Sequence, residues 1–415
     1  MPLNKPFYDI RPAFKYFDSL YGCESEEQKE RYFNLFNRFK KEFNSESGYI
    51  ASSSGRVEIC GNHTDHNGGR VICCAVSLDT LAVFLPTEDG TINIKSEGYP
   101  EISLKIDGLD SVSKGTSAAM TAGVVRGFLD RGYKVGGFNA CITSNVPGGA
   151  GISSSASFEL LIAEILNFLY NDGCVDNEEK AVIARFSENE YFGKPCGLLD
   201  QSAISFGGLR LFDFSDKNKI AVKEICNRLS GYNLVLINTG GSHENLTDEY
   251  ASIPRDMSLV AQAMGGERLI DISEFDFYKK LPGIKGKVSD RAICRAIHFY
   301  DENKRVDRVY GALNNNDYED FLLAIKESGI SSLNKLQNCC LPGSESEPIP
   351  LALFLTERFL HGGANRVHGG GFAGTILNIV KNEFLDEFIS GASKYFGKGF
   401  ITPLKVRSCG AIVLK

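Results

Sequence analysis

Residues 147–157 read PGGAGISSSAS, and this glycine- and serine-rich stretch decides how the rest of the chain is interpreted. It leads directly into an amphipathic helix, because large apolar residues recur at helical spacing from position 158 to position 169. Glycines let backbone amides approach an anion closely. A helix N-terminus favours phosphate through its unpaired N–H groups and its dipole. The stretch therefore predicts a phosphate-binding loop.

Other interpretations of this loop are weaker. A Walker loop would close on a Lys-Ser or Lys-Thr pair, which this stretch lacks. A serine-hydrolase elbow needs glycine at the fifth position of Gly-x-Ser-x-Gly, where this chain has Ser155. An ordinary loop that caps a helix is the remaining alternative, and two further motifs argue against it.

Two other segments concentrate polar residues or glycines. Residues 368–374 read HGGGFAG, a literal G-x-G-x-x-G. A dinucleotide fingerprint would follow a strand near the start of a βαβ unit, whereas this one lies near the C-terminal end, so we reject a Rossmann site. Residues 55–69 read GRVEICGNHTDHNGG, and their side chains with binding chemistry are Arg56, Asn62, His63, Asp65 and His66. A zinc site would need a further committed ligand, and none is obvious in the sequence.

In this order and spacing, the three segments and CGLLDQ at residues 196–201 resemble the galactokinase branch of the GHMP small-molecule kinases. The resemblance runs from about position 52 to the C-terminus. It implies an α+β fold of two domains, residues 1–210 and 211–415, with the active site in the cleft between them. It also implies transfer of the γ-phosphoryl group of ATP to the 1-hydroxyl of galactose. Mevalonate kinases are a poorer match, because they lack the HTDH segment.

The resemblance implies a role for each motif residue. Asp200 would accept or orient the hydroxyl proton, while Arg56 would stabilise the developing charge and keep Asp200 ionised. We expect the sugar to contact Asn62, His63, Asp65, His66 and Tyr250. We expect ATP to contact Pro147, Gly148, Gly149, Ala150, Gly151, Ser153, Ser154 and Ser155. We expect Mg²⁺ to be held by Ser154 or Ser155 together with Glu188.

The chain departs from the family pattern GRVNLIGEHTDYNGG at two telling positions, where Asn62 replaces glutamate and His66 replaces tyrosine. In the family, that glutamate accepts a hydrogen bond from the sugar's 6-hydroxyl. It would repel a 6-carboxylate by about 4 kcal/mol at about 4 Å and an effective dielectric of about 20. Galacturonate kinases of the same family share both departures and the LDQSAI of residues 199–204. A galacturonate 1-kinase is therefore the alternative. We expect Asn62→Glu to be tolerated by a galactokinase and harmful in a galacturonate kinase.

A different class of alternative is a regulator that senses sugar and ATP without catalysis. Relatives of that kind lose part of the serine loop. Here Ser153, Ser154, Ser155 and Asp200 all remain. The sequence therefore favours an enzyme.

Composition narrows the partners and the location. At 415 residues the chain is too long for one ordinary core, and its 43% hydrophobic and 23% charged residues are globular values. A net charge of −7 argues against a nucleic-acid partner. No apolar stretch approaches the roughly 20 residues that a membrane helix needs. Scattered cysteines and the lack of a secretory signal predict a cytoplasmic protein with reduced thiols. Oligomeric state cannot be predicted from the sequence.

Strands and helices alternate irregularly, which favours α+β over a doubly wound sheet. Periodicity predicts helices near residues 25–43, 116–130, 158–169, 178–191, 250–264 and 287–303. Strands are expected near residues 56–60, 71–83, 91–106, 137–143, 232–238 and 374–380, and a loop at residues 339–350. The glycine run at residues 368–374 should lie within about 15 Å of the phosphate loop, no more than several turns of helix.

Overall fold

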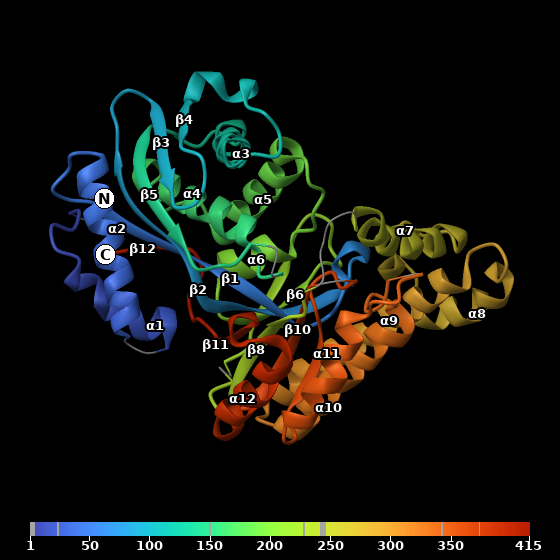
Figure 1. The fold of residues 1–415 in the computed structure, drawn as a ribbon. Coiled ribbons are helices and arrows are strands. Elements are labelled where there is room, and N and C mark those ends of the chain that lie inside the picture. The colour runs from blue at the N-terminus through green and yellow to red at the C-terminus, as the bar shows by residue number, and fades with distance from the viewer. Residues whose placement is uncertain are drawn as a thin grey trace.

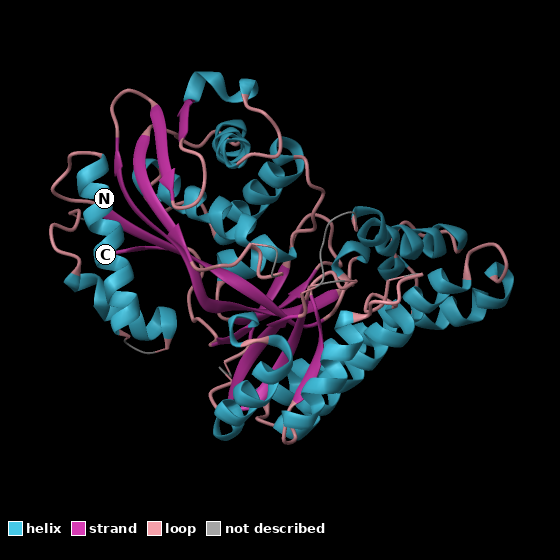
Figure 2. Ribbon diagram, viewed as in Figure 1, coloured by secondary structure: helices cyan, strands magenta, loops and turns pink. Residues whose placement is uncertain are grey.

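The computed structural model describes residues 5–22, 25–148, 151–226, 229–240, 246–341, 343–372 and 374–415. Over these residues, the structure contains two separate β-sheets, each packed between helices, which confirms the predicted α+β class (Figures 1 and 2). The first sheet has the strand order β12-β1-β2-β5-β3-β4, with β6 paired to β2 and β7 paired to β6. The second has the order β11-β8-β10-β9.

The first sheet is antiparallel except for the parallel pair β3 and β5. Its long central strand β2 pairs with β1 along most of its length, and with both β5 and β6 on the other side. Its strands are β1 (Tyr49–Cys60), β2 (Arg70–Pro86), β3 (Thr91–Ser96), β4 (Ile102–Lys105), β5 (Phe138–Ser144), β6 (Leu209–Asp213), β7 (Ala221–Glu224) and β12 (Ile412–Leu414).

Helices cover both faces of this sheet (Figure 1). One face packs against α1 (Phe17–Tyr21) and α2 (Glu26–Glu42). α2 starts after Ser25, whose hydroxyl accepts a hydrogen bond from the Gln28 amide at 3.1 Å, a normal N-cap. The other face packs against α3 (Ser117–Asp130), α4 (Ser154–Tyr170), α5 (Asn177–Phe186) and α6 (Leu199–Phe206), and the predicted phosphate loop leads into α4.

The second sheet is antiparallel and lies between two groups of helices. Its strands are β8 (Tyr232–Asn238), β9 (Ala364–His368), β10 (Thr375–Lys381) and β11 (Ile401–Leu404). One face packs against α11 (Pro348–Thr356) and α12 (Leu385–Phe396). The other faces α9 (Asp290–Asn314) and α10 (Tyr318–Ser331). α7 (Thr247–Ala263) and α8 (Glu274–Ile284) pack on α9 in a separate core.

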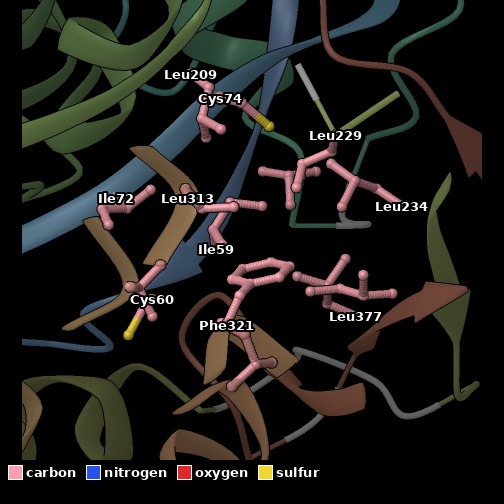
Figure 3. Packing of buried hydrophobic residues seen from close by; sticks show 14 of the residues in the cluster. Ile59, Cys60, Ile72, Cys74, Leu209, Leu229, Leu234, Leu313, Phe321 and Leu377 are labelled. Atoms are coloured by element: carbon pink, nitrogen blue, oxygen red, sulfur yellow. The ribbon is translucent and has the colours of Figure 1, made fainter. Parts of the chain in front are cut away.

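One hydrophobic core joins the two sheets. It contains Ile59 of β1, Phe321 of α10 and Leu377 of β10, which converge in Figure 3. Each of these side chains is fully buried. The two sheets therefore share a continuous interior, and Ile59 and Cys60 anchor residues 55–69, hereafter the sugar motif, in it.

The boundary predicted between residues 210 and 211 falls inside β6. All five residues of β6 pair with β2, from Arg70↔Asp213 to Cys74↔Leu209. β7 and β12 belong to the same sheet although they follow that boundary. The division into residues 1–210 and 211–415 remains a prediction, but the first sheet draws strands from both sides of it.

Most predicted elements are confirmed, and the differences are at their ends. β8 begins and ends at the predicted residues 232–238. The helix predicted at 178–191 divides into α5 and a π-helical turn, Ser187–Phe192. The loop prediction was wrong at the end of residues 339–350, because α11 begins at Pro348, where proline suits the first helical turn. Throughout the residues described, no helix combines the length and the hydropathy needed to cross a membrane.

Candidate active site

The phosphate loop ends in a strained residue. Gly151 and Ser153 both have positive φ, +71° and +63°, a region that costs a non-glycine residue about 1–3 kcal/mol. Ser153 is the N-cap of α4, yet its hydroxyl donates to the Asp200 carboxylate and caps no helix amide. The first turn of α4 also has no acidic side chain. Its amides therefore remain suited to an anion. The predicted ATP contacts Gly149 and Ala150 lie outside the described residues.

Arg56 and Asp200 form a two-pronged ion pair. Arg56 lies on β1, and its Nε and Nη2 donate to the two oxygens of Asp200 at 2.8 Å each. Its Nη1 donates to the carbonyl of Gly151 in the phosphate loop. Burial raises the pKa of Asp200, but the Arg56 charge and the hydrogen bonds from Ser153 and Arg56 outweigh it, so the pKa lies below its usual value. The Asp200 side chain is still 34% exposed, so an ionised carboxylate faces the solvent.

Glu188 lies under the start of α4. Its Oε1 accepts hydrogen bonds from Ser155 Oγ at 2.9 Å and from Lys194 Nζ at 3.1 Å. Its Oε2 accepts from Gln201 Nε2 at 2.8 Å. A hydroxyl and a carboxylate are the hard oxygen donors that Mg²⁺ prefers, with phosphate and water oxygens completing the shell. These residues fit the predicted metal and favour Ser155 over Ser154. In the described ranges, no three His, Cys, Asp or Glu side chains gather as a metal site of their own.

Asp65 approaches the segment that carries Asp200. A Cβ added to Gly197 would lie 2.5 Å from Asp65 Oδ2 and 3.4 Å from His66 Cε1. A side chain at Gly197 would therefore displace the Asp65 carboxylate. His66 Nε2 lies 3.7 Å from Asp65 Oδ1 on the more exposed side of the motif. The structure thus places Asp65 and His66 beside the CGLLDQ segment, three residues before Asp200.

The glycine run supports the sugar motif through its backbone. Burial, with His66 nearby, lowers the pKa of His63 to about 3, so its ring is neutral and Nε2 donates to the Gly370 carbonyl at 3.0 Å. The Tyr250 hydroxyl donates to the Gly371 carbonyl at 3.1 Å. The ring of Tyr250 occupies the space that a side chain at Gly370 would need. Glycine at these positions is therefore required by close packing.

The same run also packs beside the phosphate loop. His368 Nε2 accepts a hydrogen bond from the Glu58 amide at 3.2 Å. A Cβ added to Gly151 would lie 3.3 Å from His368 Nδ1. The predicted proximity of residues 368–374 to the phosphate loop is confirmed.

Asn62, predicted to contact the sugar, is fully engaged with the protein. Its Nδ2 donates to Glu58 Oε1 at 3.1 Å and to the Gly369 carbonyl at 2.9 Å. Its Oδ1 accepts from Asn338 Nδ2 at 2.8 Å. Only 1% of the residue is exposed. To bond a sugar hydroxyl, Asn62 would have to give up one of these partners.

Glu58 and Arg366 are site-region residues that the motifs did not reveal. Arg366, on β9, donates to Glu58 Oε1 and to the Ile59 carbonyl at 2.9 Å each. The family pattern GRVNLIGEHTDYNGG has asparagine at the position of Glu58. Glu58 and Asn62 therefore carry the two family residues in exchanged positions. A position-by-position comparison with that pattern would have found this exchange.

Comparison with known proteins decides the family. Residues 37–86 match the galactokinase galactose-binding signature, and residues 119–208 match the GHMP kinases N terminal domain. A galactokinase of Clostridium tetani is 30% identical over 375 residues, which cover 87% of this chain and 92% of the relative. A galactokinase of Bacillus subtilis is also 30% identical, over 81% of this chain and 85% of the relative. The chain belongs to the galactokinase family.

Solved structures confirm the fold of this galactokinase-family protein. Lactococcus lactis galactokinase complexed with galactose superposes with a TM-score of 0.79 at 22% identity, covering 91% of this chain and 98% of that one. Methanococcus jannaschii mevalonate kinase superposes with a TM-score of 0.62 at 18% identity, covering 87% and 98%. The fold is that of the GHMP kinases, and family membership makes the chain an ATP-dependent sugar kinase.

Proposed function

We propose that this galactokinase-family protein transfers the γ-phosphoryl group of ATP to the 1-hydroxyl of galactose, giving galactose 1-phosphate. The observation that carries the proposal is the setting of Asp200. Its carboxylate is held ionised by Arg56, is partly exposed, contacts Ser153 of the phosphate loop, and belongs to the segment that packs on Asp65. That setting suits a group that accepts a hydroxyl proton next to a phosphoryl donor.

The reaction assigns each side chain a defined task. Asp200 accepts the proton of the 1-hydroxyl, the freed oxygen forms a bond to the γ-phosphorus, and the bond from that phosphorus to the β–γ bridging oxygen breaks. Arg56 keeps Asp200 ionised and neutralises charge that develops beside it. The sugar is proposed to lie among the side chains of His63, Asp65, His66 and Tyr250. Asn62 is proposed to hold the sugar motif in place through its hydrogen bonds to Glu58, Gly369 and Asn338.

The nucleotide is proposed to lie at the start of α4. The residues assigned to it are Pro147, Gly148, Gly151, Ser153, Ser154 and Ser155. Ser155 and Glu188 are proposed to hold Mg²⁺, which when bound neutralises charge on the phosphates. The free amides of the first turn of α4 would add further donors to the phosphate oxygens.

A galacturonate 1-kinase is the second candidate, because Asn62 and His66 replace the usual glutamate and tyrosine. Against it, the relatives that match more than four fifths of this chain are galactokinases, which favours galactose. The sugar-sensing regulator is disfavoured because Arg56, Ser155, Glu188 and Asp200 form a complete set.

Turnover with a panel of sugars tests the proposal. Purified protein with ATP and Mg²⁺ is assayed for ADP release against galactose, galacturonate, N-acetylgalactosamine and arabinose, with Asp200→Asn as the control. We expect the highest kcat/KM with galactose, and a phosphorus NMR signal of an anomeric phosphate. A preference for galacturonate would establish the second candidate. Binding of sugar and ATP without ADP release would instead indicate a regulator.

A further inference from the structure

Lys194 lies against the proposed metal ligand, outside every motif of the sequence. It follows the π-helical turn Ser187–Phe192, which ends at Gly193 with φ +88°. The amides of Gly193 and Lys194 both donate to the Glu188 carbonyl at 3.0 Å. The chain therefore turns back at this point, and Lys194 Nζ comes within 3.1 Å of Glu188 Oε1.

The ammonium covers the open side of this carboxylate. Glu188 is 3% exposed at its side chain, whereas Lys194 is 63% exposed. Ser155 contacts the same oxygen from α4, and Gln201 contacts the other oxygen from α6. Burial lowers the pKa of Lys194, but the negative charge of Glu188 outweighs it, so the pKa is raised and the ammonium stays charged. A cation thus already occupies the carboxylate that is proposed to bind Mg²⁺.

The positive charge at Lys194 is available to a ligand, in contrast to that of Arg56. Arg56 uses Nε and Nη2 on Asp200 and Nη1 on Gly151. Among the described residues, Lys194 forms one ion pair, and most of its side chain is exposed. A triphosphate carries several negative charges, so an exposed ammonium beside the proposed metal ligand is attracted to it.

We propose that Lys194 is a nucleotide-binding residue that exchanges partners, pairing with Glu188 when metal is absent and with the triphosphate of ATP when Mg²⁺ occupies Glu188. This inference rests on the proposed function of the site. Because the ammonium and Mg²⁺ compete for the same carboxylate oxygen, Lys194 links nucleotide affinity to the concentration of metal. Removing the Lys194 ammonium should weaken the binding of ATP and strengthen the binding of Mg²⁺.

Calorimetric titration of ATP tests the exchange without relying on turnover. Wild type, Lys194→Met, Lys194→Arg and Lys114→Met are titrated in EDTA and again in saturating Mg²⁺. Lys114 is the matched control, an exposed lysine whose Cδ lies 3.4 Å from the position of a Cβ on Gly193. In Mg²⁺ we expect Lys194→Met to weaken ATP binding by about fivefold, the upper range for an exposed ion pair. In EDTA the loss is smaller, because Glu188 then holds the ammonium of the wild-type protein.

A second readout is the Mg²⁺ concentration that half-saturates the wild-type and variant proteins without nucleotide, where the metal competes directly with the ammonium for Glu188. It shifts to lower values in Lys194→Met, while Lys194→Arg and Lys114→Met stay within about twofold of wild type. Equal losses of ATP affinity with and without metal, or no loss at all, would overturn the inference. Thermal unfolding of each variant checks that the fold is intact, and Lys194→Gln replaces Lys194→Met if it is not. A wild-type protein that binds no ATP in either buffer would instead contradict the proposed function.

Discussion

Two arginine–carboxylate pairs in this protein have the same chemistry but differ in exposure and in the pKa of the carboxylate. Arg56–Asp200 and Arg366–Glu58 have closest N–O distances of 2.8 and 2.9 Å. Asp200 is 34% exposed, while Glu58 is 7% exposed and Arg366 is fully buried. The pKa of Asp200 is lowered, because Arg56 and its hydrogen bonds outweigh burial. The pKa of Glu58 is raised, because burial outweighs the charges of Arg366 and Arg56.

The difference in exposure indicates which pair a substrate can reach. Arg366–Glu58 joins β9 of the second sheet to β1 of the first, and every side of it is covered by protein. Arg56–Asp200 lies beside the phosphate loop and leaves the Asp200 side chain partly exposed. We therefore expect the closed pair to stabilise the contact between the sheets and the open pair to be available for the proposed reaction. Substitutions in the two pairs should separate stability from activity.

The largest effect is expected for Arg366→Leu. This change leaves the Glu58 carboxylate buried without its cation, which typically costs about 3–5 kcal/mol. Urea denaturation gives the loss in the free energy of unfolding. Arg308→Leu is the matched control, since Arg308 and Asp320 form a pair that is about one third exposed and of little net worth, about 0–1 kcal/mol. Equal losses for the two variants would show that the Arg366–Glu58 pair does not lock the sheets.

The next largest effect is on turnover. Asp200→Asn and Arg56→Ala should each lower kcat by at least about a hundredfold, the usual worth of a positioned acid–base or electrostatic group. The dissociation constant of ATP should change much less, because neither side chain is assigned to the nucleotide. Asp213→Asn serves as a control, since it breaks an ion pair with Arg70 away from the site. Near-normal turnover in Asp200→Asn would remove Asp200 from the catalytic role.

Asn62→Glu should have a smaller but clear cost, and here the structure revises the expectation drawn from the sequence. Whatever the sugar, the new carboxylate would face Glu58, whose Oε1 lies 3.1 Å from Asn62 Nδ2. We expect a loss of about 1–3 kcal/mol in the free energy of unfolding, as for a buried polar group without its partner. The double variant Glu58→Asn, Asn62→Glu restores the family arrangement and should recover much of the loss. Additive losses in this double-mutant cycle would exclude the exchange.

The smallest effect is on the pH dependence of stability. The two carboxylates change this dependence in opposite directions, because the pKa of Asp200 is lowered and that of Glu58 is raised. The folded pKa of Asp200 is lowered, so its stabilisation is present above its unfolded pKa of about 3.9 and is lost as pH falls through the folded pKa. The folded pKa of Glu58 is raised, so its contribution weakens as pH rises from about 4.3 toward the folded pKa. Between about pH 6 and about pH 3, Asp200→Asn should therefore flatten the acid loss of stability and Glu58→Gln should steepen it. Urea denaturation across this range measures both profiles, and shifts in the same direction would contradict the assignment.

The sequence predicted the open pair better than the closed one. Arg56, Ser153 and Asp200 lie in the segments that carry the family resemblance, which implied that Arg56 keeps Asp200 ionised. Glu58 and Arg366 are 308 positions apart, and their contact exists only because two sheets pack together. Periodicity gives no indication of which buried arginine will meet which carboxylate.

Lys194 and the ends of the first sheet were missed for a related reason. The contact of Lys194 with Glu188 depends on a π-helical turn, which hydrophobic spacing reads as ordinary helix. β12 has three residues, too few for any strand pattern to emerge. Its place beside β1 is decided by tertiary packing of Val413 and Leu414. Hydrophobic spacing in the sequence therefore could not predict very short strands or the place where the chain turns back after a π-helical turn.

Residues 368–370 contact both of the segments to which ATP and the sugar are proposed to bind. His368 borders the phosphate loop, while the carbonyls of Gly369 and Gly370 accept hydrogen bonds from Asn62 and His63. A nucleotide that orders residues 368–370 would also order the sugar motif, so the two substrates should bind cooperatively. Linkage makes such coupling reciprocal, so galactose must tighten ATP by the same factor by which ATP tightens galactose. Dissociation constants of each substrate, measured with and without the other, would reveal that shared factor.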